Sequence, residues 1–206
     1  MKTVFFKQPD QWIDASWQWL KETIEVYGIK TFFLPAGASP QGLYAKMEAI
    51  KPDFLNDIKF IQVDDILSGG SRGRFRRNFE EQLPSYTKQI HFIDQGERQA
   101  EAAILGLGLN GHVAFHEPHL PENFQFGEIT LSSETCQNLQ VSPGTKGLSY
   151  GLGHFLGCRR ILVLVNGSHK RPILQRTLAG DPDIPASRFL QHADTTVLAL
   201  ETTEGI

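Results

Sequence analysis

Residues 101–118, EAAILGLGLNGHVAFHEP, decide the fold. Their apolar run, residues 102–107, ends in glycines and leads directly into polar residues. A short apolar run that is closed by glycines is typical of a parallel strand covered on both faces. In an open α/β sheet, ligands bind outside the carboxyl ends of such strands. We therefore predict a buried central strand whose C-terminal loop carries chemistry.

The loop after this strand groups titratable side chains, because His112, His116, Glu117 and His119 lie within eight residues. A single histidine in a loop is more simply a residue without a chemical role. The grouping of several such residues favours a functional site instead. A metal site built from the three histidines is an alternative, but the spacing identifies no fourth ligand. We therefore expect neither a metal nor another cofactor.

Hydrophobic periodicity and turn residues predict strands that alternate with helices along most of the chain. The predicted strands cover residues 29–34, 58–63, 90–93, 102–107, 128–131, 160–166 and 195–200. The predicted helices cover residues 10–28, 40–51, 74–83, 144–157 and 187–191, with another that starts at Pro172. This order predicts an α/β fold, a doubly wound, mostly parallel sheet with helices on both faces, in a single domain over residues 1–206.

Two predicted turns have the residues of an anion site. After strand 29–34, small residues lead to Ser39, a possible helix N-cap, and to Pro40, which suits the first helical position. A helix N-terminus presents free N–H groups to an anion, although an ordinary capped turn explains the same residues equally well. After strand 160–166, the turn GSHK adds the ammonium group of Lys170.

Adjacent carboxylates, Asp64 and Asp65, follow strand 58–63. They can cap the next turn, bind a cation or act as a general base. Side chains alternate along a strand, so we expect at most one of the two to face a pocket. The arginines that follow, Arg72 among them, can contact an anionic ligand, but a solvated helix face is the simpler interpretation.

Composition excludes several classes of function. With 206 residues, 40% hydrophobic and 21% charged content and a net charge of −3, the chain is typical of an ordinary α/β domain. This charge argues against nucleic-acid or membrane-surface partners. We interpret Cys136 and Cys158 as reduced thiols, because their spacing fits neither a metal site nor a redox pair. Without a signal-peptide pattern or a long apolar stretch, a cytoplasmic location is expected.

Four stretches together resemble the glucosamine-6-phosphate deaminase (isomerase) and 6-phosphogluconolactonase superfamily. They are LPAGASPQGLY at residues 34–44, VDDI at 63–66, GLGLNGHVAFHEP at 106–118, and the glycine-rich segment, strand and lysine of residues 147–170. The resemblance extends from about residue 29 to residue 200. The phosphate loop alone is a weak motif, but the four stretches in order are specific.

The resemblance implies roles for individual residues. It implies a sugar phosphate held by Ala36, Gly37, Ala38 and Ser39 with Lys170. It makes Asp64 the base that moves a proton at C2 of the sugar, and it makes His112 with Glu117 the group that opens the sugar ring. Asn110 joins this catalytic group, at a position where the family has aspartate. Asp65, Arg72 and Gly111 are further candidates for substrate contact.

The motif AFHEP favours the deaminase branch, because lactonases usually lack a glutamate five residues after the histidine. A lactonase remains the alternative, and a weakly active or non-catalytic sugar-phosphate sensor is another. The sequence departs from the family in three ways. Asn110 stands where the family has aspartate, and residues 136–141 lack the arginine that the family has there. The segments that follow residues 65 and 118 are also shorter than in most deaminases. The expected partner is a small sugar phosphate, and the expected assembly is a monomer or small homo-oligomer.

Overall fold

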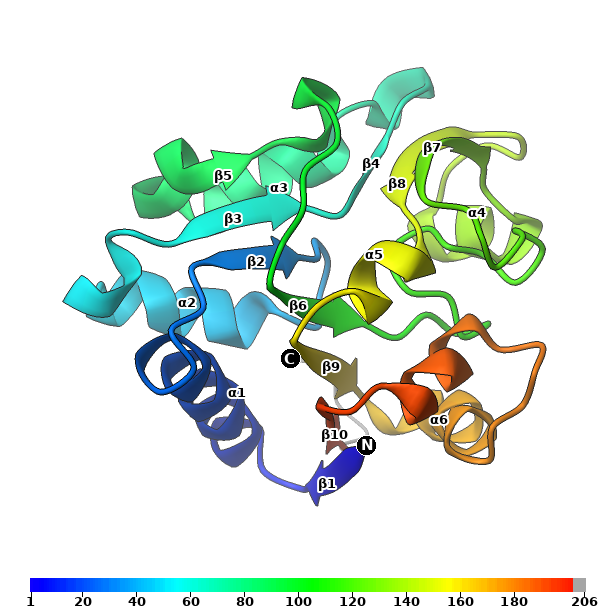
Figure 1. Cartoon of the computed structure of the whole chain (residues 1–206). Coiled ribbons are helices and arrows are strands. Elements are labelled where there is room, and N and C mark those ends of the chain that lie inside the picture. Colours follow the sequence, from blue (N-terminus) through cyan, green and yellow to red (C-terminus); the bar gives the residue numbers. More distant parts are fainter. Residues whose placement is uncertain (202–206) are drawn as a thin grey trace.

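The main sheet has seven strands, and every neighbouring pair in it is parallel (Figure 1). The computed structural model describes residues 1–201. Across the sheet the strands are β1 (Lys2–Phe6), β10 (Thr195–Leu200), β9 (Arg160–Asn166), β6 (Ala102–Gly106), β2 (Thr31–Leu34), β3 (Lys59–Gln62) and β5 (Ile90–His91). The prediction of a mostly parallel α/β sheet is confirmed.

Helices cover both faces of this sheet, as predicted. β9 is buried along its whole length, and its side chains alternate between two cores. Leu162 and Leu164 pack toward α1 (Pro9–Glu25), α2 (Gln41–Ile50) and α3 (Arg74–Gln82). Val163 and Val165 pack toward α5 (Leu152–Leu156) and α6 (Arg171–Leu178). Short 3-10 turns complete the connections: η1 (Asp53–Leu55), η2 (Gly69–Ser71), η3 (Pro84–Gln89), η4 (Ile93–Gln95), η5 (Ser168–Lys170) and η6 (Pro185–Gln191).

A second, antiparallel sheet was not predicted. It consists of β4 (Asp64–Ile66), β8 (Lys146–Tyr150) and β7 (Phe126–Thr130), with α4 (Ser133–Leu139) beside it. In Figure 1 it lies on the side toward which the arrowheads of β2, β3 and β6 point. We call it the small sheet. It therefore stands at the carboxyl edge of the main sheet, where the candidate site was expected.

The predicted helix over residues 144–157 is wrong in its first half. Residues 146–150 are a strand because they pair on both sides, with β4 and with β7. A Cβ on Gly147 would lie 2.8 Å from the ring of Phe115, so this glycine allows the strand to pack closely on the loop after β6, residues 107–117. The helix begins only after Gly151.

Two further corrections concern the N-terminal half. Strand β1 was not predicted, because it is a half-exposed edge strand in which Phe5 is 51% exposed, so it lacks the apolar run of a buried strand. Ser39 was expected to cap α2, but the helix begins at Gln41 with Pro40 at the N-cap, and no side chain caps it. The hydroxyl of Ser39 is thereby left for other contacts.

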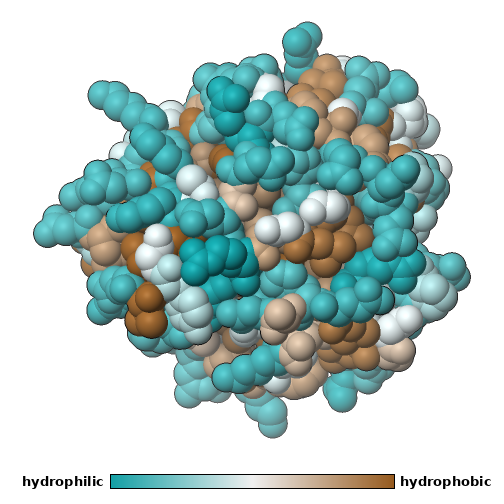
Figure 2. Space-filling view, viewed as in Figure 1, coloured by the Kyte–Doolittle hydropathy of each residue, from teal (hydrophilic) through white to brown (hydrophobic). Residues whose placement is uncertain are grey.

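Figure 2 shows hydrophilic residues over most of one face of the molecule, with hydrophobic residues in small separate groups. Along residues 1–201, no helix combines the length and the apolar character that crossing a membrane requires.

Candidate active site

The end of β6 lies between two of the predicted phosphate-binding groups. The ammonium group of Lys170, in the turn after β9, donates a hydrogen bond to the carbonyl of Leu107 at 2.6 Å. On the other side, a Cβ placed on Gly106 would lie 3.7 Å from the hydroxyl oxygen of Ser39. The turn after β2 and the turn after β9 therefore meet over the carboxyl end of the central strand.

The turn after β2 leaves donors free. Ala36 and Gly37 are half-buried, Ala38 is exposed, and Gly37 has a φ of 97°. Within residues 1–201 we find no hydrogen bond from the backbone N–H groups of residues 36–39. Burial lowers the pKa of Lys170 to about 8, since the charged form is costly to bury. An anion between these groups would receive hydrogen bonds and favour the charged lysine.

Two glycines of the catalytic loop, residues 107–117, are needed because side chains pack too closely on their backbone to leave room for a Cβ. A Cβ on Gly108 would lie 2.3 Å from Nε2 of His112, so only glycine lets the imidazole pack on this backbone. Gly111 has a φ of 83°, and its carbonyl accepts a hydrogen bond from the N–H of Ala186. Gly111 thus shapes the loop and attaches it to η6, and its role is structural.

His112, Asn110 and Glu117 form one hydrogen-bonded group. The Asn110 amide donates from Nδ2 to Oε2 of Glu117 at 2.8 Å and accepts at Oδ1 from the backbone N–H of His112 at 3.1 Å. Nδ1 of His112 lies 3.7 Å from the same Oε2. The asparagine therefore fixes both partners in place, and its amide adds no negative charge beside Glu117.

Glu117 is fully buried, yet it is held in its ionised form. Burial alone would raise its pKa, but the His112 imidazole, whose Nδ1 lies 3.7 Å from Oε2, and the hydrogen bond from Asn110 lower it to about 2. The backbone N–H of Ser132 donates to Oε1 at 3.3 Å. Glu117 is consequently an anion that orients its neighbours, and it carries no proton near neutral pH.

The start of α4 supplies site residues that the sequence did not reveal. Ser132 is the N-cap and accepts from the N–H of Thr135 at 3.1 Å. The Thr135 hydroxyl lies 3.3 Å from Nδ1 of His112. The only sequence signal was the Ser-x-x-Thr spacing of an N-cap, and no helix was predicted here.

Asp64 and Asp65 have opposite surroundings. The Asp65 carboxylate accepts from the N–H groups of Ile66, Phe75 and Arg76 at 2.7–3.0 Å and from the Gln62 amide at 3.1 Å. It therefore anchors the start of α3 and is not available to a substrate. For the Asp64 carboxylate we find no hydrogen bond within residues 1–201, although the residue is only 5% exposed. Burial, with a smaller effect of the Asp65 charge, raises its pKa well above the ordinary value.

Asp64 lies between the turn after β2 and the catalytic loop. It pairs with Ser149 in the small sheet, and the Ser149 hydroxyl accepts from the N–H of Phe115 at 3.0 Å. On the other side is Tyr44, whose hydroxyl donates to the Pro35 carbonyl at 2.7 Å. Burial and, to a lesser extent, the nearby Asp64 charge raise the pKa of Tyr44. These contacts place Asp64 beside Tyr44 and the turn after β2, and they connect it through Ser149 to the loop that carries His112.

Other predicted residues lie outside this group. Arg72 is exposed. His119 is exposed as well, whereas His116 is buried and accepts from the N–H of Leu152 at 3.2 Å. Burial lowers the pKa of His116, which suits this acceptor role. In the described part of the chain, no group of three or more His, Cys, Asp and Glu side chains is arranged to hold a metal.

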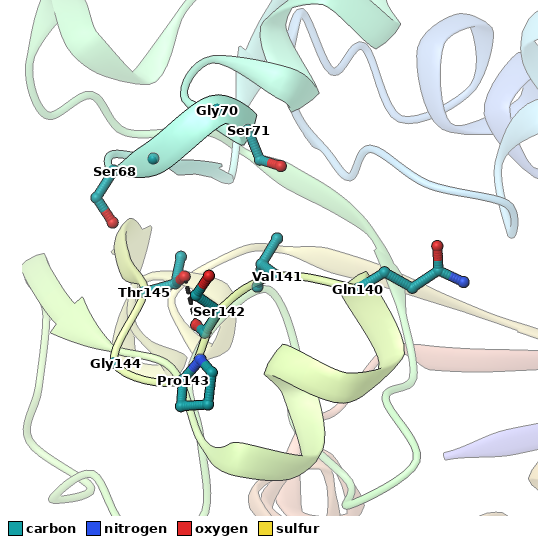
Figure 3. A pocket seen from close by; sticks show the side chains of 10 residues that line it. Ser68, Gly70, Ser71, Gln140, Val141, Ser142, Pro143, Gly144 and Thr145 are labelled. Atoms are coloured by element: carbon teal, nitrogen blue, oxygen red, sulfur yellow. Dashed lines mark hydrogen bonds between the residues drawn. The ribbon is translucent and has the colours of Figure 1, made fainter.

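A separate cavity of about 280 Å³ lies farther along the small sheet (Figure 3). Residues 68–71 and 140–145 line it, and in Figure 3 the Thr145 hydroxyl donates to the Ser142 carbonyl. Arg74 joins its two walls, because it donates to Ser71 and to the Leu139 carbonyl. None of the catalytic candidates lines this cavity, so it is distinct from the candidate active site.

The chain is similar to known proteins over nearly its whole length. A glucosamine-6-phosphate deaminase of Bacillus cereus is 24% identical over 97% of this chain and 86% of the relative, and one of Bacillus thuringiensis is 25% identical over the same shares. Among solved structures, a monomeric glucosamine-6-phosphate deaminase has a TM-score of 0.81 at 21% identity and covers 98% of both chains.

A 6-phosphogluconolactonase from Thermotoga maritima has a TM-score of 0.73 at 21% identity, with 98% of this chain and 100% of that one covered. These structures share the fold described above. The family of glucosamine-6-phosphate isomerases/6-phosphogluconolactonase matches residues 47–198. That match includes Asp64, the catalytic loop and Lys170, and by it the chain belongs to the glucosamine-6-phosphate isomerase/6-phosphogluconolactonase family.

Proposed function

We propose that the protein is an isomerase and deaminase of an amino-sugar 6-phosphate. Its substrate is glucosamine 6-phosphate or galactosamine 6-phosphate, and its products are a ketose phosphate and ammonia. The observation that carries the proposal is Asp64, a buried carboxylate without a hydrogen-bond partner among the described residues, in the same site as the His112–Glu117 group.

Asp64 is suited to move a proton at C2. Abstraction of a proton next to a carbonyl or imine carbon needs a carboxylate that is positioned and basic. Burial makes the carboxylate of Asp64 more basic, since its pKa is raised. A base left without donors keeps its lone pairs for the substrate, and this supports Asp64 as the group that carries the proton between C2 and C1.

His112 is suited to open the sugar ring. Nδ1 faces the ionised Glu117, which leaves Nε2 to take the proton of the anomeric hydroxyl and return it to the ring oxygen. Glu117 stabilises the imidazolium that forms during this transfer. Asn110 holds both groups by its two hydrogen bonds.

The phosphate is bound by the backbone N–H groups of residues 36–39, the Ser39 hydroxyl and Lys170. The free N–H groups before α2 and the helix dipole favour an anion there, and the ammonium of Lys170 adds the charge. This ammonium donates to the Leu107 carbonyl, and binding of a phosphate would draw it toward the phosphate oxygens. The phosphate orients the sugar with its reacting carbons toward Asp64.

The second candidate activity is hydrolysis of 6-phosphogluconolactone. It is favoured by the partial exposure of the His112 side chain, at 18%, because lactone hydrolysis needs a histidine that activates water. This reaction does not require proton transfer at C2. It therefore has no use for Asp64 as a base, and loss of the Asp64 carboxylate separates the two activities.

The test is ammonia release from each of the two amino-sugar phosphates, with lactone hydrolysis measured in parallel. Asp64→Asn should lower ammonia release by about 10²- to 10⁴-fold, and Asp57→Asn, which removes an exposed acid, should leave it unchanged. If the protein releases no more ammonia than its Asp64→Asn variant, the proposal is wrong. Lactone hydrolysis that survives Asp64→Asn and is lost in His112→Ala would assign the second activity instead.

The sensor alternative is tested by ligand-induced stabilisation. A sugar phosphate that binds the folded protein raises its unfolding temperature in proportion to the logarithm of concentration over Kd. A shift that requires Lys170, without turnover of any substrate, would identify a sugar-phosphate binding protein and contradict the enzymatic proposal.

A further inference from the structure

We propose that Asn166, the last residue of β9, is a further residue that binds the substrate phosphate, through the N–H groups of its side-chain amide. The proposal rests on the proposed function, because it adds a contact to the phosphate site of Ser39 and Lys170. It makes a separate statement about the protein without substrate, namely that this amide is unpaired, and that statement can be tested by itself.

The Asn166 amide is buried without a hydrogen-bond partner. The residue is 6% exposed, and its Oδ1 is enclosed and accepts no hydrogen bond. Within residues 1–201 we find no hydrogen bond from Nδ2 either. Burial of an amide without partners costs free energy, and nearly all buried polar groups in folded proteins are paired. An unpaired amide therefore calls for a reason other than the stability of the fold.

The fold does not require a polar side chain at this position. Asn166 pairs in register with Leu200 of β10, which is 1% exposed. Leu162 and Leu164, which precede it on the same face of β9, belong to one apolar core together with Leu200. A leucine would suit the same surroundings, so the asparagine is retained at a cost in stability.

A second buried amide in the main sheet shows what a structural role looks like. Gln62 is the last residue of β3 and is fully buried. Its Nε2 donates to the Asp64 carbonyl at 2.8 Å and to the Asp65 carboxylate at 3.1 Å. Its Oε1 accepts from the N–H of Ile93 at 3.3 Å. The amide of Asn166 has none of these ties, although it stands at the corresponding end of another strand.

The register of the main sheet places Asn166 near the turn after β2. Leu164 pairs with Gly106, and residues two apart on a strand share a face, so Asn166 lies diagonally from Gly106 on that face. The Cα atoms of such neighbours are about 8 Å apart. Ser39 covers the same face, because its hydroxyl oxygen would lie 3.7 Å from a Cβ on Gly106. One small anion can therefore contact both side chains.

The turn after β9 connects Asn166 to the ammonium group of the phosphate site. The turn begins at Gly167, whose φ is 94°, and the N–H of Lys170 donates to the Gly167 carbonyl. Nζ of Lys170 lies 2.6 Å from the carbonyl of Leu107, beyond the end of β6. A phosphate held between Lys170 and the turn after β2 is thus close to the end of β9. Phosphate oxygens accept hydrogen bonds, so Nδ2 is the end of the amide that serves them.

The first test measures the thermal stability of the protein without ligand. Asn166→Leu replaces an unpaired amide by an apolar group of similar size and should raise the unfolding temperature by about 2–4 °C. Gln62→Leu is the matched control, because it removes a buried amide that is paired, and it should lower the unfolding temperature. If Asn166→Leu lowers it as well, the amide is structural and the proposal is overturned.

The second test measures binding of inorganic phosphate by the rise in unfolding temperature that the anion produces. Asn166→Leu should weaken this binding by about 10- to 100-fold, the loss expected for a hydrogen bond to a charged group. Asn166→Thr keeps a hydroxyl donor and should lose less, whereas Lys170→Gln should bind phosphate weakly. Loss of the phosphate effect in Lys170→Gln but not in Asn166→Leu overturns the role of Asn166 and leaves the proposed function standing. A complete absence of stabilisation by phosphate in the unaltered protein overturns it too.

The third test is kinetic and uses the amino-sugar 6-phosphates. The phosphate is held equally in the ground state and the transition state, so Asn166→Leu should raise KM by about 10- to 100-fold and leave kcat nearly unchanged. A fall in kcat at unchanged KM overturns the proposal. If no ammonia is released while phosphate binding depends on Asn166, the proposed function fails and the contact between Asn166 and phosphate stands.

Discussion

At the scale of single residues, hydrogen bonds assign different roles to identical side chains. Asp64 and Asp65 are adjacent and both buried, yet Asp65 is surrounded by donors and Asp64 has none among the described residues. Strand alternation predicted that at most one faces a pocket. Which one could not be predicted, because the donors Phe75 and Arg76 belong to a helix whose position depends on the whole fold.

Asp64→Asn should stabilise the protein near neutral pH, and Asp65→Asn should destabilise it. Because the pKa of Asp64 is raised in the folded protein, its ionised form lowers the free energy of unfolding. This cost is largest above the pKa of the folded state, and it disappears as the pH falls to the ordinary pKa that the carboxyl has in the unfolded chain. We expect Asp64→Asn to gain ~1 kcal/mol and Asp65→Asn to lose ~1–3 kcal/mol in urea unfolding. The stability gained in Asp64→Asn should shrink as the pH falls toward about 4. A loss in both variants would contradict this assignment.

Asn110→Asp should lower stability rather than repair the site. It places a second carboxylate beside Glu117, at the position now 2.8 Å from Oε2, where two negative charges cannot both persist. We expect a loss of ~1–3 kcal/mol near neutral pH that partly recovers toward about pH 5, where the pair shares a proton. Asn138→Asp adds the same charge on an exposed face of α4 and should show no such pH dependence in thermal unfolding.

At the scale of elements, the catalytic loop contains backbone strain at Ala114. Its φ is 50°, a left-handed conformation that is unfavourable for alanine, and it lies in the turn closed by the hydrogen bond from the His116 N–H to the Val113 carbonyl. The turn places Phe115 against Ser149. Strain is therefore located between His112, the proposed ring-opening group, and the link to the small sheet.

Ala114→Gly should be neutral or stabilising, by up to ~1 kcal/mol, because glycine adopts this φ without steric cost. Ala103→Gly, in the buried strand β6, should destabilise by at least ~1 kcal/mol, since a strand conformation suits alanine and its methyl group is packed. Chemical denaturation of both variants gives the comparison. A similar loss in the two would show that the turn at Ala114 is not strained.

The elements also show where sequence patterns are informative. β9 was predicted with its observed bounds, because the apolar run of residues 161–165 is continuous and is bounded by Arg160 and Asn166. β8 was misassigned because its pairing with β4 and β7 is a long-range property, and its glycine is explained only by Phe115. The residues from α4 were missed for the same reason, since Thr135 meets His112 only after the small sheet has formed.

At the scale of the whole molecule, the two sheets differ in how well they are protected. β9 lies inside the main sheet and is fully buried, whereas β7 lies at an edge of the small sheet and only one of its five residues is buried. The alternation of strands and helices predicted the main sheet. Of the small sheet it predicted only a strand over residues 128–131, which overlaps β7; the pairing of β7 with β8 and β4 was not predicted.

Hydrogen exchange should separate the two sheets. Amides of β9 and β6 should exchange only by global unfolding, while those of β7 should exchange through local opening of the small sheet, at least about 100-fold faster under native conditions. Exchange of peptides containing residues 126–130 and 160–166, followed by mass spectrometry, measures this difference. Equal protection of the two would mean that both sheets unfold as one cooperative unit.

The hydrogen bond from Phe115 to Ser149 has a further consequence for redesign of the enzyme. It joins the loop of His112 to the sheet that carries Asp64, so the relative position of these two proposed catalytic groups depends on this joint. The rings of Phe75 and Phe115 pack beside this joint, tilted by 35° with their centroids 5.5 Å apart. Exchanging them for smaller or larger side chains is a route to accepting shorter or longer substrates while every catalytic residue is left in place.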